Sequence, residues 1–81
     1  MENRKFQVAL GERIKKIRLE KNMSQTLLAS QCSIEKANLS RIESGQANPT
    51  VLTLLKISAA LNVSVAEFFK YEIQEPALES R

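Results

Sequence analysis

Residues 36 to 41 carry a group of side chains that could recognise the edges of nucleic-acid bases. The group consists of Lys36, Ala37, Asn38, Ser40 and Arg41. Lys and Arg can donate to O6 and N7 of guanine, Arg in bidentate geometry, and Asn can pair with adenine or hold a phosphate. The methyl group of Ala suits a contact with thymine. The alternative is that some of these side chains only keep a helix surface soluble.

A second group of polar residues could hold the phosphates that flank such bases. Its members are Ser24, Gln25, Gln46, Asn48 and Thr50. Gln25 follows a Ser that can begin a helix, so its amide and the free backbone N–H groups beside it could donate to a phosphate oxygen. The other three could donate from a loop and from the start of the next helix. Taken alone, all of these are also ordinary cap, loop or solvated helix residues.

The pattern from residue 24 to residue 45 predicts the element that would position both groups. Ser24 is a favourable N-cap, and Gly45 suits the left-handed position after a helix. Between them, two short helices are joined by a tight turn. Their apolar residues form two stripes that can close on each other at a steep angle: Leu28, Ala29, Ile34, Leu39 and Ile42. The outer face of the second helix stays polar, as in a helix-turn-helix that enters the major groove of DNA.

A first amphipathic helix is expected before this motif. Leu10, Ile14 and Ile17 recur at helical spacing, which predicts a helix over residues ~6 to 21. Gly11 lies inside it, although Gly is less favourable there than Ala by up to about 1 kcal/mol. Its presence therefore indicates close packing against another element.

Two more helices are expected after the motif. A fourth should begin at Thr50 and end at Asn62, and its apolar residues are too numerous for one stripe, so we expect it to be mostly buried: Leu52, Leu55, Ile57, Ala59 and Leu61. The segment Ser64-Val-Ala-Glu67 has the form of a capping box, which predicts a short fifth helix. Pro76 then breaks the pattern. Residues 1–75 are expected to form one all-α domain and residues 76–81 a flexible tail.

Composition narrows the class of protein. The 81 residues suffice for one domain, and without His, with Cys32 as the one cysteine, neither a zinc finger nor a disulfide framework is available. Cys32 is expected to be a small buried hydrophobe, with redox sensing as the alternative. No long apolar run or signal peptide is present, which favours a cytoplasmic protein. No cofactor, metal or small-molecule effector domain is expected, and no catalytic constellation suggests an enzyme.

Charge is unevenly distributed along the chain. Residues 1–41 hold nine Lys and Arg against four Asp and Glu, a net charge of +5, whereas residues 42–81 hold three against five, a net charge of −2. The positive half contains the expected base-reading helix, as attraction to DNA phosphates requires. A solvated basic face without a partner is the alternative.

Several segments, in order and with matching gaps, resemble the lambda-repressor/Cro-like helix-turn-helix family, also called the XRE family. They are Leu10-Gly-Glu-Arg-Ile-Lys-Lys-Ile-Arg, Met23-Ser-Gln, Leu28-Ala, Ser40-Arg-Ile-Glu-Ser-Gly45, Pro49-Thr and Leu55-Lys-Ile-Ser-Ala-Ala-Leu. The resemblance implies a compact five-helix DNA-binding domain with bases read by Lys36, Ala37 and Arg41. It also implies an ion pair between Arg18 and Glu43 that links the first helix to the third.

Two residues depart from the family pattern. Ser33 stands where many members have Gly, so the turn must accommodate a Cβ at a position that is often left-handed. Glu35 stands where a Ser or Thr cap is commoner. Its carboxylate complements the helix dipole but would repel a nearby phosphate, or it could instead accept from cytosine N4.

The C-terminal part is expected to form a two-fold dimer. One reading helix contacts only a few base pairs, and members of the family double their readout on a palindromic site. With Phe68 assigned to the core, the candidates for the interface are Val65, Phe69, Tyr71 and Ile73. The alternative is that Phe69 also points inward and the segment only covers the core.

The sequence therefore predicts a transcriptional regulator whose partners are double-stranded DNA and a second copy of the chain. The alternative is a protein-interaction module that kept the fold and lost specific DNA binding. Lys36 and Arg41 argue against that alternative, because they retain the chemistry of base recognition. A phage-type repressor, a restriction-modification controller and an antitoxin-like autoregulator all remain open.

Overall fold

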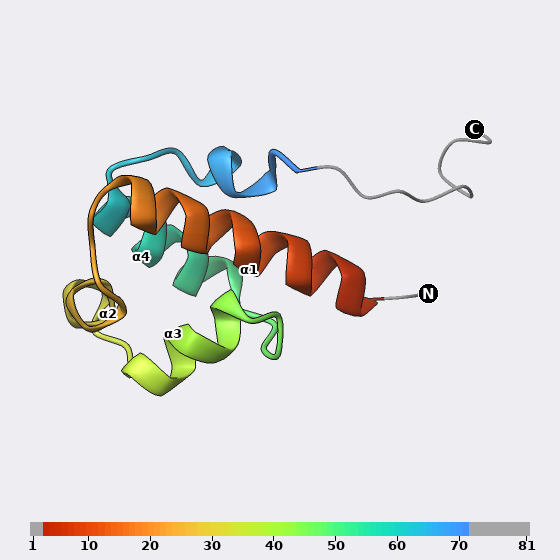
Figure 1. The fold of residues 1–81 in the computed structure, drawn as a ribbon, viewed down its shortest axis with the longest axis horizontal. Coiled ribbons are helices and arrows are strands. Elements are labelled where there is room, and N and C mark those ends of the chain that lie inside the picture. Colours follow the sequence, from red (N-terminus) through yellow and green to blue (C-terminus); the bar gives the residue numbers. More distant parts are fainter. Residues whose placement is uncertain (1–2, 72–81) are drawn as a thin grey trace.

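The computed structural model describes residues 3–71, which form four α-helices followed by one short 3₁₀ helix (Figure 1). The elements are α1 (Asn3–Glu20), α2 (Gln25–Cys32), α3 (Lys36–Glu43), α4 (Val51–Leu61) and η1 (Val65–Phe69). No strand occurs in this part of the chain, so the expected all-α class is found. The long α1 runs through the middle of the molecule, with α3 packed on one side and η1 on the other.

The prediction of a fifth α-helix is wrong, because residues 65–69 form the 3₁₀ helix η1. Ser64 accepts a hydrogen bond from the Ala66 amide, the second of the helix, whereas a capping box would use the third, that of Glu67. The Glu67 carboxylate does not complete the box. It binds Arg13 and Lys70 instead, and the Glu67 and Lys70 amides donate to carbonyls three residues earlier. Five residues are too few to build a ladder of α-helical hydrogen bonds.

The starts of α2 and α4 follow from local side-chain chemistry. Ser24 Oγ accepts from the Leu27 amide at 3.0 Å, and Thr50 Oγ1 accepts from the Thr53 amide at 3.1 Å. Each bond satisfies one of the N–H groups that a helix leaves free in its first turn. Both expected caps are therefore present.

All four α-helices end in the same way. The chain turns into the left-handed region at Asn22, Ser33, Gly45 and Asn62, with φ values of 59°, 60°, 82° and 59°. The next amide then donates back to a carbonyl five residues earlier, for example Ile34 N to Ala29 O at 3.0 Å. This is the Schellman arrangement, and it confirms that Ser33 carries its Cβ in a left-handed position. After three of the ends, the following residue is an apolar one that packs on the core: Met23, Ile34 and Val63.

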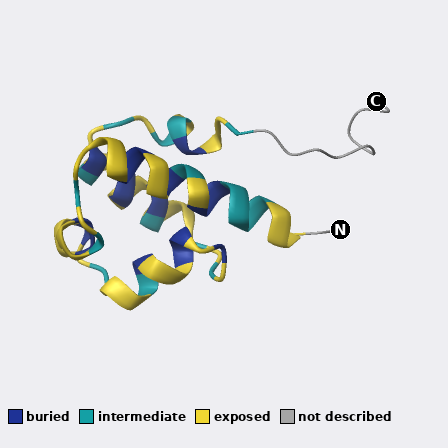
Figure 2. Ribbon diagram, in the orientation of Figure 1, coloured by how far each residue is buried: buried dark blue, intermediate teal, exposed yellow. Residues whose placement is uncertain are grey.

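The core is one cluster to which every element contributes (Figure 2). Its fully buried members include Ile14 of α1, Leu28 of α2, Leu39 of α3, Ile57 of α4 and Phe68 of η1. Burial of each large apolar side chain contributes about 1.5–3 kcal/mol relative to leaving it exposed. Because α2, α3, α4 and η1 are too short to be stable alone, this shared burial holds them in place.

The prediction that α4 is mostly buried is wrong. Leu54, Ile57 and Leu61 face the core, but Leu52 and Leu55 are exposed, and Ala59 is exposed as well. The reason is that α4 packs on α2 and η1 along one side, and no other element within residues 3–71 covers the opposite side.

Gly11 sets the distance between α1 and α3. A Cβ on Gly11 would overlap the carbonyl oxygen of Ile42 and would lie 2.6 Å from the carbonyl oxygen of Glu43. Both are backbone atoms at the end of α3, so they cannot rotate away as a side chain would. The expectation of close packing at Gly11 is confirmed, and it is the missing Cβ that allows the contact.

We expect Gly11→Ala to lower the free energy of unfolding by about 1–3 kcal/mol, because overpacking outweighs the helix preference of Ala. Thermal unfolding followed by circular dichroism measures this. The matched control is Glu12→Ala at the adjacent exposed position, which should be neutral or slightly stabilising. Equal melting temperatures for the Gly11 variant and the parent would show that the helices can separate at no cost.

Candidate nucleic-acid interface

Helix α3 has two chemically opposite faces. Leu39, Ile42 and Glu43 are buried against the rest of the domain. The residues expected to read bases lie on the other face, where Lys36, Ala37, Ser40 and Arg41 are exposed, while Asn38 is half-buried at the edge. Positions i, i+1, i+4 and i+5 share one side of an α-helix, so the structure brings four of the five side chains together on one surface.

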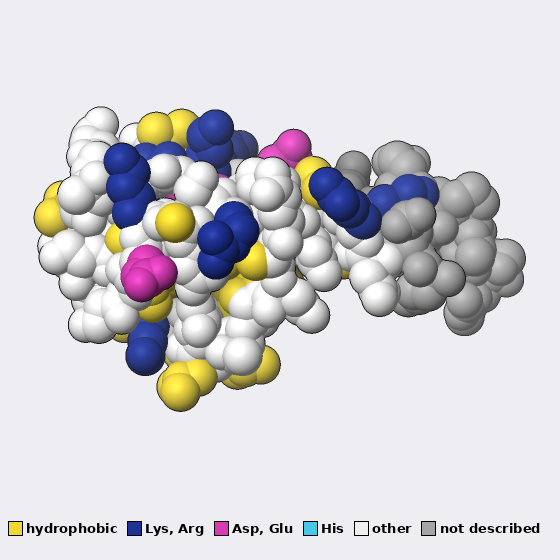
Figure 3. Space-filling view, turned by 90° about the horizontal axis from the view of Figure 1, so that it is seen from below, with side chains coloured by type: hydrophobic (Ala, Val, Ile, Leu, Met, Phe, Trp, Pro, Cys, Tyr) yellow, Lys and Arg dark blue, Asp and Glu magenta, His cyan; other side chains and the backbone are white. Residues whose placement is uncertain are grey.

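Several separate Lys and Arg side chains are spread over the face of the molecule on which α3 lies (Figure 3). One acidic side chain lies among them in the left part of this view, and another lies at the upper edge. Among residues 24 to 50, the two carboxylates are Glu35 and Glu43, and only Glu35 is exposed. The exposed charges of residues 24 to 50 are thus those of Lys36 and Arg41 against that of Glu35, a small positive excess.

The ion pair that ties α3 to α1 is present and buried. Arg18 Nε donates to Glu43 Oε2 at 2.7 Å, and Arg18 Nη2 donates to Glu43 Oε1 at 3.0 Å. The exposed fractions of the two side chains are 7% and 2%. Arg18 Nη1 also donates to the Met23 carbonyl at 2.7 Å, which ties the pair to the turn before α2. The planar guanidinium suits this bidentate geometry, and all the buried charge is hydrogen-bonded.

Gln25 also belongs to this network, a contact that the sequence did not predict. Its Nε2 donates to Glu43 Oε1 at 2.9 Å from the first turn of α2. A carboxamide nitrogen carries two hydrogens, so this bond uses one and leaves the other available. No local sequence pattern predicts this hydrogen bond, because residues 25 and 43 are brought together only by the packing of α2 against α3.

The other expected phosphate ligands lie in different local settings. Ser24 and Thr50 are exposed and act as helix caps, and Thr50 Oγ1 also donates to Thr53 Oγ1 at 3.1 Å. Gln46 and Asn48 are exposed in the loop between α3 and α4. Their side chains make no hydrogen bond with residues 3–71, so their amides are free to meet a ligand.

Residues 65–71 form a partly exposed apolar segment that packs on α1. Phe68 is fully buried, whereas Phe69 is 49% exposed, so the alternative in which Phe69 points inward is wrong. The Phe69 and Tyr71 ring centroids lie 6.4 Å apart, and Val65 and Tyr71 are half-buried against the core. The fourth interface candidate, Ile73, lies outside the described residues.

Arg13 of α1 binds this segment through Glu67, an interaction that the sequence did not predict. Its Nε donates to the Glu67 carbonyl at 2.8 Å, and its Nη2 lies 3.4 Å from Glu67 Oε1. Lys70 Nζ donates to Glu67 Oε2 at 2.8 Å, and this hydrogen bond is the main reason that the pKa of the Glu67 carboxyl lies below its usual value, with Arg13 contributing further. The contacts join α1 to the segment that the sequence assigned to the dimer interface.

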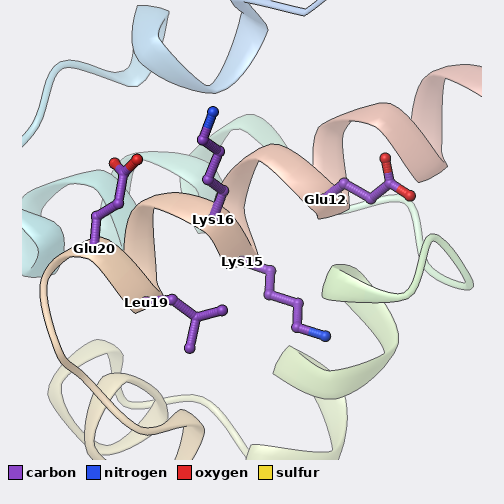
Figure 4. A pocket seen from close by; sticks show the side chains of 5 residues that line it. All are labelled: Glu12, Lys15, Lys16, Leu19 and Glu20. Atoms are coloured by element: carbon purple, nitrogen blue, oxygen red, sulfur yellow. The ribbon is translucent and has the colours of Figure 1, made fainter.

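Several large apolar side chains are exposed, among them Leu52 and Leu55, which the sequence predicted to be buried. Val51 is 71% exposed and Leu52 is 65% exposed on α4, with Leu55 beside them. On α1, Leu19 is exposed beside Lys15, both pointing toward the α2–α3 side (Figure 4). Such residues are normal singly, but the three on α4 fall on one stretch of a helix.

Cys32 is buried at the end of α2, and its Sγ donates to the Lys56 carbonyl at 3.7 Å. Burial raises the pKa of the thiol, with nearby Lys56 acting in the opposite direction. A raised pKa reduces the thiolate fraction that oxidation requires. The expectation of a small buried hydrophobe is confirmed. Within residues 3–71 no group of His, Cys, Asp and Glu could hold a metal ion, and no helix is long and apolar enough to cross a membrane.

A family comparison identifies the class of protein that this fold and surface define. The helix-turn-helix model HTH_3 matches residues 14–68, more than half of the chain. The chain therefore belongs to the HTH_3 helix-turn-helix family, the XRE-type regulators that the sequence resembles.

The chain is similar to two kinds of regulator within this family. It is 36% identical over 65 residues to control protein C.MunI of Mycoplasma, a match covering 79% of this chain and 88% of that protein. It is 46% identical over 57 residues to the transcriptional regulator SinR of Bacillus subtilis, covering 69% of this chain but only 51% of SinR. It thus spans nearly all of C.MunI and about half of SinR.

Solved structures of the same two kinds of regulator resemble this fold. The restriction-modification controller protein C.AhdI of Aeromonas hydrophila superposes with a TM-score of 0.76 at 31% identity, over 76% of this chain and 94% of that chain. The N-terminal DNA-binding domain of SinR superposes with a TM-score of 0.70 at 40% identity, over 82% of this chain and 96% of that domain. The relatives are named as regulators, which are not enzymes.

We expect Glu43→Ala to lower the free energy of unfolding by about 3–5 kcal/mol, because it leaves the Arg18 guanidinium buried without its carboxylate. Chemical denaturation measures the change. The control is the double variant Arg18→Met with Glu43→Met, which removes both charges and should recover most of the loss. If Glu43→Ala alone lies within about 1 kcal/mol of the parent, the pair is solvated in solution and does not fix α3.

Proposed function

We propose that this protein is a sequence-specific transcriptional regulator that binds a palindromic operator as a dimer, with α3 in the major groove. The observation that carries the proposal is the exposed face of α3, which presents Lys36, Ala37, Ser40 and Arg41 opposite a fully buried face. Arg41 and Lys36 supply donors for guanine, and Ala37 supplies a methyl contact. Similarity to C.MunI, C.AhdI and SinR supports the assignment to DNA.

Gln25 connects phosphate binding to the position of the reading helix. Its amide is held by Glu43 at 2.9 Å, and Glu43 is held by Arg18, so the remaining N–H of Gln25 is fixed relative to α3. A phosphate bound there, together with the free backbone amides at the start of α2, would set the depth at which α3 lies in the groove. Ser24, Gln46, Asn48 and Thr50 are the further phosphate ligands in this proposal.

The first test separates base contacts from phosphate contacts. Arg41→Ala should weaken binding to the preferred duplex by about 1–3 kcal/mol and relax the preference at one base pair. Gln25→Ala should weaken preferred and random duplexes alike, since phosphates are common to both. Fluorescence anisotropy at fixed salt measures both effects.

A charge control completes this test. Lys16→Ala removes one positive charge from the side of α1 that points away from α3 (Figure 4), so base preference should not change. Equal losses on all sequences for Arg41→Ala would contradict the base contact. The alternative function, a protein-interaction module without specific DNA binding, would be supported by the absence of any salt-dependent shift of duplex DNA by the parent.

The dimer in this proposal uses the exposed apolar side chains of residues 65–71, with Ile73 beyond the described residues as a further candidate. Half of the Phe69 surface is exposed beside Tyr71, and a two-fold axis through this segment would pair the same patch on both copies. The two α3 helices would then lie about 34 Å apart, one turn of B-DNA. Val51, Leu52 and Leu55 on α4 are the competing apolar surface.

Phe69→Asp should convert the dimer to a monomer and weaken operator binding together, while the helical circular dichroism stays unchanged because the side chain is half exposed. Analytical ultracentrifugation at tens of micromolar measures association. Leu52→Asp is the matched variant on α4, and Leu19→Asp is the control on α1. If only Leu52→Asp dissociates the protein, the interface lies on α4; if the parent is a monomer that binds one half-site tightly, the dimer proposal fails.

A further inference from the structure

Glu35 begins α3 without capping it. Ser24, Thr50 and Ser64 each accept a backbone N–H of the helix that they precede. Glu35 occupies the same kind of position with the same extended backbone, at φ −75° and ψ 143°, yet its side chain makes no cap hydrogen bond. The helix therefore gains no capping hydrogen bond from this side chain, which a Ser or Thr would supply, and keeps only the interaction of its charge with the helix dipole.

The carboxylate of Glu35 is also not neutralised. It is exposed, and no ion pair joins it to any residue within 3–71, whereas Glu43 is buried against Arg18 and Glu67 is bound by Lys70. It is the exposed negative charge of the motif and directly precedes Lys36. On a surface that binds phosphates, such a charge weakens attraction to every DNA sequence alike. It is compensated only where it meets a hydrogen-bond donor on the DNA.

We propose that Glu35 selects a cytosine in the operator by accepting a hydrogen bond from its N4 amino group. The inference rests on the proposed function, because it requires α3 to lie in the major groove. The N-terminal residues of a recognition helix are those that reach base edges, which places Glu35 and Lys36 at the bases.

Base-edge chemistry identifies the base. A carboxylate can only accept, and in the major groove guanine offers two acceptors, thymine an acceptor and a methyl group, and adenine an acceptor beside its donor. Cytosine alone offers a donor with no acceptor beside it on the same base. Its partner guanine offers O6 and N7 to a neighbouring cation, and Lys36 is that neighbour along the chain. At its position in the operator, Glu35 therefore disfavours the other bases by repulsion and favours cytosine through a hydrogen bond.

The test compares the duplexes selected from a random pool by the parent, by Glu35→Gln and by Glu35→Ser. The parent should select cytosine at one position of each half-site. Glu35→Ser should lose that preference by about 5- to 150-fold while binding random duplexes more tightly, and Glu35→Gln should shift it toward adenine, which an amide can bind in bidentate geometry. Because Ser is a good N-cap, loss of selectivity in that variant cannot come from loss of α3.

Two controls separate base reading from net charge. Glu20→Gln makes the same charge change on the side of α1 that points away from α3 (Figure 4), and it should leave the selected sequence unchanged. N4-methylation of the selected cytosine should weaken binding of the parent but not of Glu35→Ser. Identical base preferences for the parent and both Glu35 variants would overturn the inference and leave the proposed function intact. Failure of the parent to enrich any sequence would overturn both.

Discussion

The orientation of α3 depends on its contact with α1. The buried pair between Arg18 and Glu43 fixes the end of α3 through two hydrogen bonds, and Gly11 allows the two backbones to approach until a Cβ would not fit. A helix of eight residues has little stability of its own, so its position is set by what it packs against. Whatever α3 presents on its outer face is therefore positioned by residues of α1.

The same contact extends to the surface. Glu43 accepts from Gln25 as well as from Arg18, and Arg18 donates to the turn before α2 through the Met23 carbonyl. The Glu43 carboxylate thus links α1, α2 and α3. Through Gln25, this network extends from the core to the edge of the proposed DNA surface. A ligand that orders Gln25 would act on the same carboxylate that holds α3 in place. Net stability from such a pair is small, but its directional bonds specify one arrangement.

Much of the fold could be predicted because its determinants are local. Helix starts at Ser24 and Thr50, and the left-handed ends at Asn22, Ser33, Gly45 and Asn62, depend on hydrogen bonds between residues no more than five positions apart. The two faces of α3 follow from a period of 3.6 residues. These patterns already separated the exposed residues that we propose to read bases from the core, and the family resemblance supplied the partner of Arg18.

The sequence by itself therefore determined the all-α class, the helix-turn-helix and the set of polar residues on α3. Only the tertiary structure decided what lies against what. It exposed Val51 and Leu52 of α4, reduced the fifth helix to the 3₁₀ helix η1, and joined Arg13 to Glu67. An apolar residue is buried only if another element covers it, and an ion pair forms only if packing brings its partners together. The spacing of neighbouring residues predicts neither condition, because both depend on contacts between segments far apart in the chain.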